Sequence, residues 1–410
     1  MDDFTNLLES SNKFILRRAV ERLRDGLFDP LAVHLLTARE SQLNELFDKS
    51  VQALSHNESP HLCISGAYGQ GKSHSLAYIH ERALRQGFVT SLINLDPREI
   101  PFHDFQRVYR ALVGQIRFPG CDDTLAQYWK KWVYEQKTVQ ENSFELVENI
   151  PDSMPHFFKS VLVAIAGENI PLSRKQKELK KNGAFRPREF PWLLANALKG
   201  ESLPVYRLRH ALRYRQVPFY NEASLVCKGW EPYFQAVCGL AEMFQNMGFK
   251  GWVLLFDEGE SIGQRPVNIR RKSYTILDRF FSSAAALPGL YPIFAFTDEF
   301  FMQVRNEDYD RTYTRNGQES LYFEKNYGEF WQHLNLYHLD DLASEDWQNM
   351  ITKLIYLHSM AYSWKPPVKE ISGKMAEVLK ETVEQEARLK IKGLVEQLDL
   401  DQQRVVLTVH

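Results

Sequence analysis

One octapeptide constrains this chain more than any other feature, because it fits the pattern Gly-x4-Gly-Lys-Ser/Thr and lies in the context that the pattern needs. Residues 61–65, just before it, form a short apolar run that predicts a buried strand. Residues 75–85, just after it, have apolar side chains at helical spacing. A chance match is the alternative, and the flanking strand and helix disfavour it. The order strand, glycine loop, helix predicts a nucleoside triphosphate site made of Gly66, Ala67, Tyr68, Gly69, Gln70, Gly71, Lys72 and Ser73.

The residue types of this loop suit phosphate binding. Glycines let the backbone wrap closely around phosphate oxygens, and the start of the next helix directs N–H groups at them. Lys72 is expected to reach the β and γ phosphates, and the Ser73 hydroxyl is expected to ligate Mg²⁺. The loop therefore predicts that the chain binds ATP with Mg²⁺.

A second motif is an apolar strand, residues 251–256, that ends in acid. It would deliver Asp257 to the carboxyl edge of the sheet, where the carboxylate can hold Mg²⁺. The adjacent Glu258 can orient and polarise the attacking water, an arrangement typical of hydrolysing ATPases. An acidic strand end that merely starts a loop is the alternative. Glu260, two residues further on, is interpreted as a solvated or loop-bonding carboxylate.

Length and composition suggest a multi-part globular chain. With 410 residues, it exceeds the size at which one core usually keeps growing, so we expect two or three substructures. The composition, 44% apolar and 25% charged, is typical of soluble proteins. The start Met1-Asp2-Asp3-Phe4 has no basic stretch followed by an apolar one, and no apolar run approaches 18 residues. These features favour a cytoplasmic location.

The strand pattern predicts an α/β fold. We expect five strands separated by helices, which implies a mainly parallel sheet. The strands are predicted at residues 61–65, 88–95, 251–257, 291–297 and 334–339. Residues 98–250 show helical patterns and no convincing strand. The expected organisation is a helical N-terminal region (1–60), an ATPase core (61–97 and 251–342), a mostly helical insertion (98–250) and a helical lid (343–410).

The order of these motifs resembles the AAA+ ATPases, with a P-loop core, a large helical insertion and a small helical C-terminal lid. More narrowly, four segments resemble the ATP-binding proteins of BREX-type bacteriophage-defence loci, which are often found beside a helicase. These segments are residues 22–30, residues 36–40, Asp257-Glu258-x-Glu260 and residues 296–301. The resemblance implies ATP hydrolysis, assembly into a homo-oligomer and a helicase or other defence protein as partner.

The resemblance also implies further site residues. Thr297, after the fourth strand, matches the position called sensor 1, although many relatives have Asn there. An arginine finger is expected in a helix before the fifth strand, where Arg305, Arg311 and Arg315 lie, and Arg311 or Arg315 is favoured. Arg388 is the candidate for sensor 2, the lid arginine that touches the γ-phosphate. For each arginine, a solvated surface charge is the alternative.

A basic segment lies within the insertion. Between residues 174 and 215 there are twelve Lys or Arg and three acids, so the local net charge is +12 − 3 = +9 in a chain whose total is −2. Clustered cations favour nucleic-acid phosphates because binding releases counterions. Phe185, Phe190, Trp192 and Tyr206 are interleaved and could pack on sugars or bases. The segment favours DNA binding, and the alternative is a solvated linker followed by ordinary helix faces.

Three functional classes follow from these patterns. The first is an AAA+ motor or switch that acts on DNA, or on a DNA-bound partner, in phage defence. The second is a loader or targeting ATPase of the replication or transposition type. The third is a signalling NTPase that regulates a protein complex without touching nucleic acid, and the basic segment argues against it.

Overall fold

The structure is a computed structural model of the chain. It describes residues 8, 11–27, 29–56, 58–139, 150–167, 169, 171–183, 186–215, 217, 225–282, 287–381 and 386–408. Phe185, one of the aromatic residues interleaved with the basic segment, lies outside the described residues.

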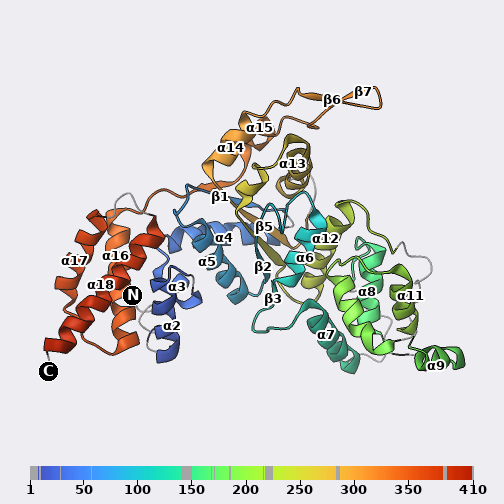
Figure 1. Ribbon diagram of the computed structural model, residues 1–410, viewed down its shortest axis with the longest axis horizontal. Coiled ribbons are helices and arrows are strands. Elements are labelled where there is room, and N and C mark those ends of the chain that lie inside the picture. The colour runs from blue at the N-terminus through green and yellow to red at the C-terminus, as the bar shows by residue number, and fades with distance from the viewer. Residues whose placement is uncertain are drawn as a thin grey trace.

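A six-stranded sheet occupies the centre of the molecule (Figure 1). Its strand order is β3-β2-β4-β5-β1-β8, and all neighbours are parallel except β2 and β3. The strands are β1 Leu62–Ser65, β2 Val89–Asn94, β3 Ile116–Arg117, β4 Trp252–Asp257, β5 Leu290–Phe296 and β8 Leu336–His338. The mainly parallel α/β sheet is confirmed. The count of five was wrong, because two-residue β3 lies inside the insertion and is too short to have a recognisable sequence period.

Helices cover both faces of the sheet. On one face, α4 Glu40–Ser55 and α5 Lys72–Arg85 pack on alternate strand residues such as Ile64 and Leu255. The opposite residues of the same strands, such as Phe256 and Phe294, join a core shared with the insertion. The two rings stack with centroids 4.3 Å apart. Side chains that alternate between two buried faces explain why the central strands are apolar throughout.

The insertion forms a largely helical lobe beside the sheet (Figure 1). Its longest core helix, α12, buries the aromatic stretch that includes Tyr233, Phe234 and Phe244, as the helical spacing predicts. At the far end, short α9 buries no residue. The elements of the lobe are α6 Phe105–Gly114, α7 Leu125–Val139, α8 His156–Ala166, α9 Arg174–Lys181, η2 Pro187–Glu189, α10 Phe190–Leu198, α11 Val205–Tyr214 and α12 Glu231–Asn246.

A β-hairpin projects from the core (Figure 1). In sequence it lies between β5 and β8. Its strands are β6 Thr312–Arg315 and β7 Gln318–Leu321, joined by Asn316 and Gly317 with positive φ. We expected Arg311 and Arg315 to lie in a helix, and this expectation was wrong. Asn-Gly is the strongest two-residue hairpin signal, because both residues accept φ above zero, and the sequence analysis missed it. The other elements here are η3 Gly259–Ile262, α13 Val267–Phe281, α14 Asp298–Arg305, α15 Tyr327–Phe330 and η4 Trp331–His333.

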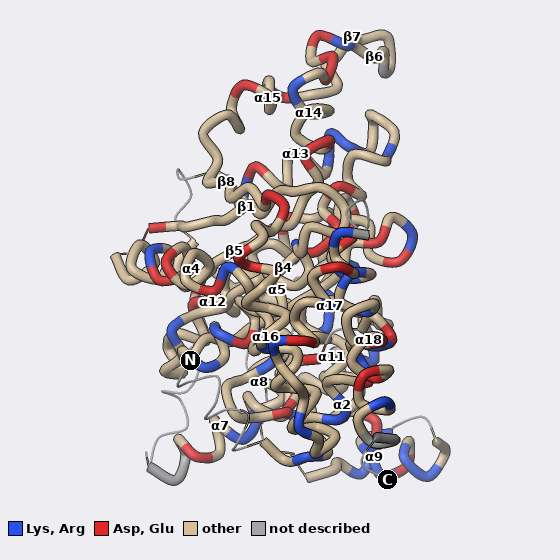
Figure 2. Tube along the Cα trace, turned by 90° about the vertical axis from the view of Figure 1, so that its left-hand side faces the viewer, with Lys and Arg blue, Asp and Glu red and all other residues tan. Residues whose placement is uncertain are grey.

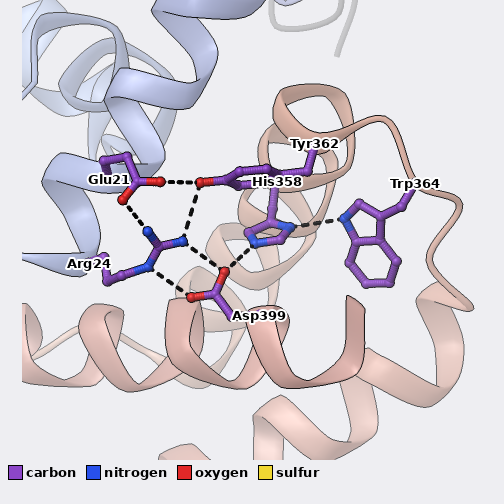
Figure 3. A network of polar contacts seen from close by, with 6 residues as sticks. All are labelled: Glu21, Arg24, His358, Tyr362, Trp364 and Asp399. Carbon is purple, nitrogen blue, oxygen red and sulfur yellow. Dashed lines mark hydrogen bonds and ion pairs between the residues drawn. The ribbon is translucent and has the colours of Figure 1, made fainter. Parts of the chain in front are cut away.

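The two ends of the chain form one helical cluster. Helices α2 Lys13–Arg24 and α3 Pro30–Leu36 share a core with α16 Ser344–Tyr362, α17 Val368–Glu381 and α18 Ala387–Thr408. A polar network crosses this cluster and joins α2, α16 and α18 (Figure 3). The N-terminal helices are therefore divided between two cores, because α2 and α3 pack with the C-terminal helices and α4 packs on the sheet.

Candidate functional site

A cavity of about 340 Å³ lies where the glycine loop, the end of β4 and the helical cluster meet. The loop and strand supply its polar floor, and apolar residues of α2, α3 and α18 supply walls. Cavities of this size, with apolar walls and a few convergent polar groups, are typical of small-ligand sites. The residues of the loop and of the strand end that line the floor are Tyr68, Gly69, Gln70, Gly71, Lys72, Ser73, Asp257, Glu258 and Glu260.

The glycine loop holds its lysine through its own backbone. Lys72 is buried, and its Nζ donates to the carbonyl oxygens of Gly66 at 2.8 Å and Ala67 at 2.9 Å. The ammonium group also lies 5.1 Å from the centroid of the Tyr68 ring. Helix α5 begins at Lys72 and directs its first backbone N–H groups toward the same space. A buried cation at a helix start favours an anionic ligand such as a phosphate.

The end of β4 makes a tight turn that places two acids in the cavity. Glu258 has left-handed backbone angles, φ 56° and ψ 40°, and its N–H donates to Asp257 Oδ1 at 2.9 Å. This region is unfavourable for a residue with a side chain, and strained residues of this kind cluster at functional sites. Gly259 follows in a space where a Cβ would lie 2.5 Å from the Phe296 ring. The turn therefore depends on glycine at this position.

Glu260 lies inside the cavity, whereas the sequence predicted a solvated or loop-bonding carboxylate. Only 8% of its surface is exposed, and its Oε2 has no hydrogen-bond partner in the described part of the chain. Burial raises the pKa of Glu260, a hydrogen bond from its own backbone N–H and the nearby charge of Lys72 lower it, and the charges of Asp257 and Glu258 raise it. The solvated alternative was therefore wrong, because η3, a single short turn without a sequence period, returns the chain to the cavity, and a hydrogen bond from its own backbone agrees with the loop-bonding alternative.

The predicted sensor 1 residue lies at the same edge of the sheet. Thr297 is buried directly after β5, and the carbonyl oxygen of Phe296 before it accepts from the Gly66 N–H at 3.3 Å. Thr297 does not line the cavity among the described residues. The next residue, Asp298, accepts a hydrogen bond from the Ser65 hydroxyl and lies 3.7 Å from His338 Nδ1. Asp298 therefore ties together the ends of β1 and β8.

The predicted arginines are divided between two places. Arg388, in the first turn of α18, lines the cavity and packs against Gly26. Arg311 lies on the projecting hairpin with its guanidinium 5.5 Å from the Tyr322 ring centroid, and Arg315 ends β6. Arg305 ends α14. Of Arg305, Arg311 and Arg388, whose side chains the structure describes, only Arg388 lines the cavity.

Several cavity residues were missed by the sequence analysis. His74 Nε2 lies 2.9 Å from Thr37 Oγ1, which donates its own hydrogen to the Val33 carbonyl, so the imidazole is the donor. Burial lowers the pKa of His74 to about 4, which keeps the ring neutral. Glu386 packs directly on Gly69 of the glycine loop. These contacts join segments far apart in sequence, so no local pattern could have revealed them.

The residues present fit a magnesium-bound nucleotide. In the described ranges, no three His, Cys, Asp or Glu side chains form a metal cluster. Mg²⁺ at nucleotide sites usually takes one or two protein ligands and completes its shell with waters and phosphates, so a three-ligand cluster is not required. Ser73 and Asp257 both line the cavity, and the unpartnered Glu260 oxygen beside them can accept a hydrogen bond from a metal-bound water.

The basic segment lies at the opposite end of the molecule from the helical cluster (Figure 1). The Lys and Arg residues of α9 are exposed, and in Figure 2 this helix lies at the lower edge of the molecule. Arg186 and Arg207 are instead paired with Glu189, and Arg215 donates to the Gly167 carbonyl at 2.9 Å. Arg188, Arg209 and Arg213 are exposed as well, so the exposed charge extends from α9 over η2 and α11.

A lysine-bearing glycine loop and two strand-end acids in one cavity define a P-loop nucleotide-binding protein. The chain belongs to the family of BREX system ATP-binding proteins BrxC/D, whose family model matches residues 15–169 and 230–408. This confirms the family predicted from the sequence and makes the chain an ATP-binding protein of BREX phage defence. No curated protein and no solved structure matches the chain. Among the described residues, no helix is long and apolar enough to cross a membrane.

Proposed function

We propose that the chain binds Mg²⁺-ATP in this cavity and hydrolyses it as an AAA+-like ATPase. The observation that carries the proposal is the convergence of Lys72, Asp257 and Glu258 on one cavity, although the two motifs are more than 180 residues apart. The parallel strands β1 and β4 explain this convergence, because their carboxyl ends meet at one edge of the sheet.

The proposed mechanism assigns one task to each side chain. Lys72 exchanges its two backbone carbonyl partners for the β and γ phosphates, so the loop is already shaped around its ammonium group. Ser73 and Asp257 would hold Mg²⁺, which neutralises phosphate charge when bound. Glu258, exposed and held by the strained turn, orients the attacking water and polarises it.

Two variants test this mechanism. Lys72→Ala removes a phosphate contact present in both ground and transition states, so we expect loss of ATP binding. Glu258→Gln removes the water-orienting carboxylate, so we expect ATP binding within about threefold of wild type and turnover lowered by at least about 100-fold. Glu231→Gln, an exposed acid in the first turn of α12, is the control and should keep full turnover. Wild-type turnover in Glu258→Gln would remove that residue from the mechanism.

We further propose that the active protein is a homo-oligomer whose sites are completed by an arginine from a neighbouring subunit. The support is that the projecting hairpin carries both arginines, and that Arg311 does not line the cavity of its own chain. An arginine supplied in trans contributes about 10³-fold or more to turnover. Native mass and ATPase rate test this, because a strictly monomeric sample with full turnover contradicts it. Full activity in Arg311→Ala and Arg315→Ala also contradicts it.

DNA is the proposed macromolecular target, and the exposed cations of α9 support this proposal. The basic segment lies between the two ranges matched by the family model, so its role rests on charge rather than on family membership. Reversing Lys175, Lys177, Lys180 and Lys181 to Glu should weaken DNA binding and flatten its salt dependence, with basal ATPase unchanged. Unchanged affinity and slope would favour a protein partner and a signalling role. ATP-dependent DNA retention with slow turnover would favour a loader.

A helicase or another protein of the same defence system is the proposed partner, and the cytoplasm the proposed location. Both proposals follow from the family and from the need for ATP and DNA in one compartment.

A further inference from the structure

The turn after β4 brings Glu260 into the cavity. After β4 ends at Asp257, left-handed Glu258 reverses the chain, and Gly259 packs against the end of β5. A Cβ on Gly259 would lie 2.7 Å from the Ala295 carbonyl oxygen, so the backbone approaches β5 as closely as glycine allows. The turn η3 then directs Glu260 back beside the glycine loop. The same strained turn therefore positions two carboxylates and not one.

One carboxylate oxygen of Glu260 has unused capacity to accept a hydrogen bond. Its Oε2 is buried and has no hydrogen-bond partner among the described residues, and such an oxygen costs free energy while it stays unpaired. Burial and the charges of Asp257 and Glu258 raise the pKa of Glu260, whereas a hydrogen bond from its own backbone N–H and the charge of Lys72 lower it. Tyr68 is also close to Glu260, because burial, the charge of Glu260 and a hydrogen bond to Glu260 raise the pKa of the Tyr68 phenol.

We propose that Glu260 is a third acidic residue of the ATP site, whose unpaired oxygen accepts a hydrogen bond from a water bound to Mg²⁺ beside the phosphates. This inference deepens the proposed function and rests on it, because it assigns a positioning residue to the same site. Asp257 and Glu258 are more exposed and are assigned to the metal and to the attacking water. Glu260 makes ATP binding depend on Mg²⁺, because a buried carboxylate repels bare ATP more strongly than the metal complex, whose charge is partly neutralised.

The measurement is the affinity for ATP, by calorimetry, with excess Mg²⁺ and with EDTA. For wild type, we expect Mg²⁺ to tighten binding, and the ratio of the two dissociation constants reports the carboxylate. Glu260→Gln keeps the shape of the side chain and removes its charge, so this ratio should fall by at least about tenfold, mainly because bare ATP binds more tightly. Glu260→Asp keeps the charge and should retain most of the ratio. Glu231→Gln, an exposed acid of α12 outside the cavity lining, should leave the ratio unchanged.

A purely structural role for Glu260 predicts a different result. Loosening of the turn would raise both dissociation constants by the same factor. An unchanged ratio in Glu260→Gln therefore overturns the inference, whatever happens to affinity or turnover. The proposed hydrolysis is tested separately. If wild type binds ATP in a Mg²⁺-dependent way without hydrolysing it, the ATPase proposal fails, and a lowered ratio in Glu260→Gln still supports the inference. ATP binding that is insensitive to Mg²⁺ in wild type overturns it.

Discussion

The buried histidine of the helical cluster offers a sharp test of how the cavity is held together. His358 is completely buried on α16, and each of its nitrogens has a partner (Figure 3). Trp364 Nε1 donates to Nδ1 at 2.9 Å, so Nε2 carries the hydrogen and faces Asp399 Oδ1 at 3.0 Å. Burial lowers the pKa of His358, in accord with a neutral ring. Asp399 in turn receives two bonds of 2.8 Å from Arg24 on α2.

The change His358→Ala should destabilise the protein by about 3–5 kcal/mol. It leaves the buried Trp364 N–H unpaired, which costs about 1–3 kcal/mol. The cavity left by the ring adds about 2 kcal/mol. Asp399 loses the hydrogen bond from His358 and keeps its ion pair with Arg24, so it adds less to the loss of stability than Trp364 does. Because α2 carries Leu23 in the cavity wall, we also expect weaker ATP binding.

Urea unfolding followed by tryptophan fluorescence gives the free energy, and calorimetry gives the ATP affinity. Tyr356→Ala is the matched control, because this side chain lies on the same helix and is 45% exposed, so its loss should cost less than about 1 kcal/mol. A cost below about 1 kcal/mol in His358→Ala would refute the reasoning. A full stability loss with unchanged ATP affinity would show that the network does not support the site.

Two further predictions concern the site itself. Gly259→Ala should cost about 1–3 kcal/mol and lower ATPase activity, because the added Cβ would lie 2.5 Å from the Phe296 ring. Gly373→Ala, where a Cβ meets nothing within 4 Å, is the control for urea unfolding and should be neutral or stabilising. Burial lowers the pKa of His74 from 6.5 to about 4, so the unfolded chain takes up a proton before the folded chain does. Stability is thus present above pH 6.5 and is lost as the pH falls toward 4, by about 3 kcal/mol from this residue. His74→Gln should flatten that part of the stability curve, and an unchanged curve would contradict the assignment.

Local patterns in the sequence were enough to predict the nucleotide-binding motifs. The glycine loop, β1 and α5 are adjacent in sequence. Each of them needs particular residue types because of its own backbone geometry and burial, so a local pattern is enough to identify all three. The apolar run of β4 predicted that Asp257 and Glu258 end a central strand, and they do. The hairpin at Asn316-Gly317 also had a local signal, and it was overlooked in favour of a helix.

Tertiary structure alone decided how the cavity is enclosed. The sequence left Glu260 as a solvated or loop-bonding carboxylate, and in the structure the turn that brings Gly259 against β5 leaves Glu260 buried. Arg24 and Asp399 pair across 375 positions and hold α2 against α18, so that residues from both ends of the chain form the cavity wall. Periodicity reveals that a helix has an apolar face and does not reveal which distant helix will cover it, because many apolar faces satisfy the same burial. The choice depends on shape and on buried polar pairs, which exist only once the chain has folded.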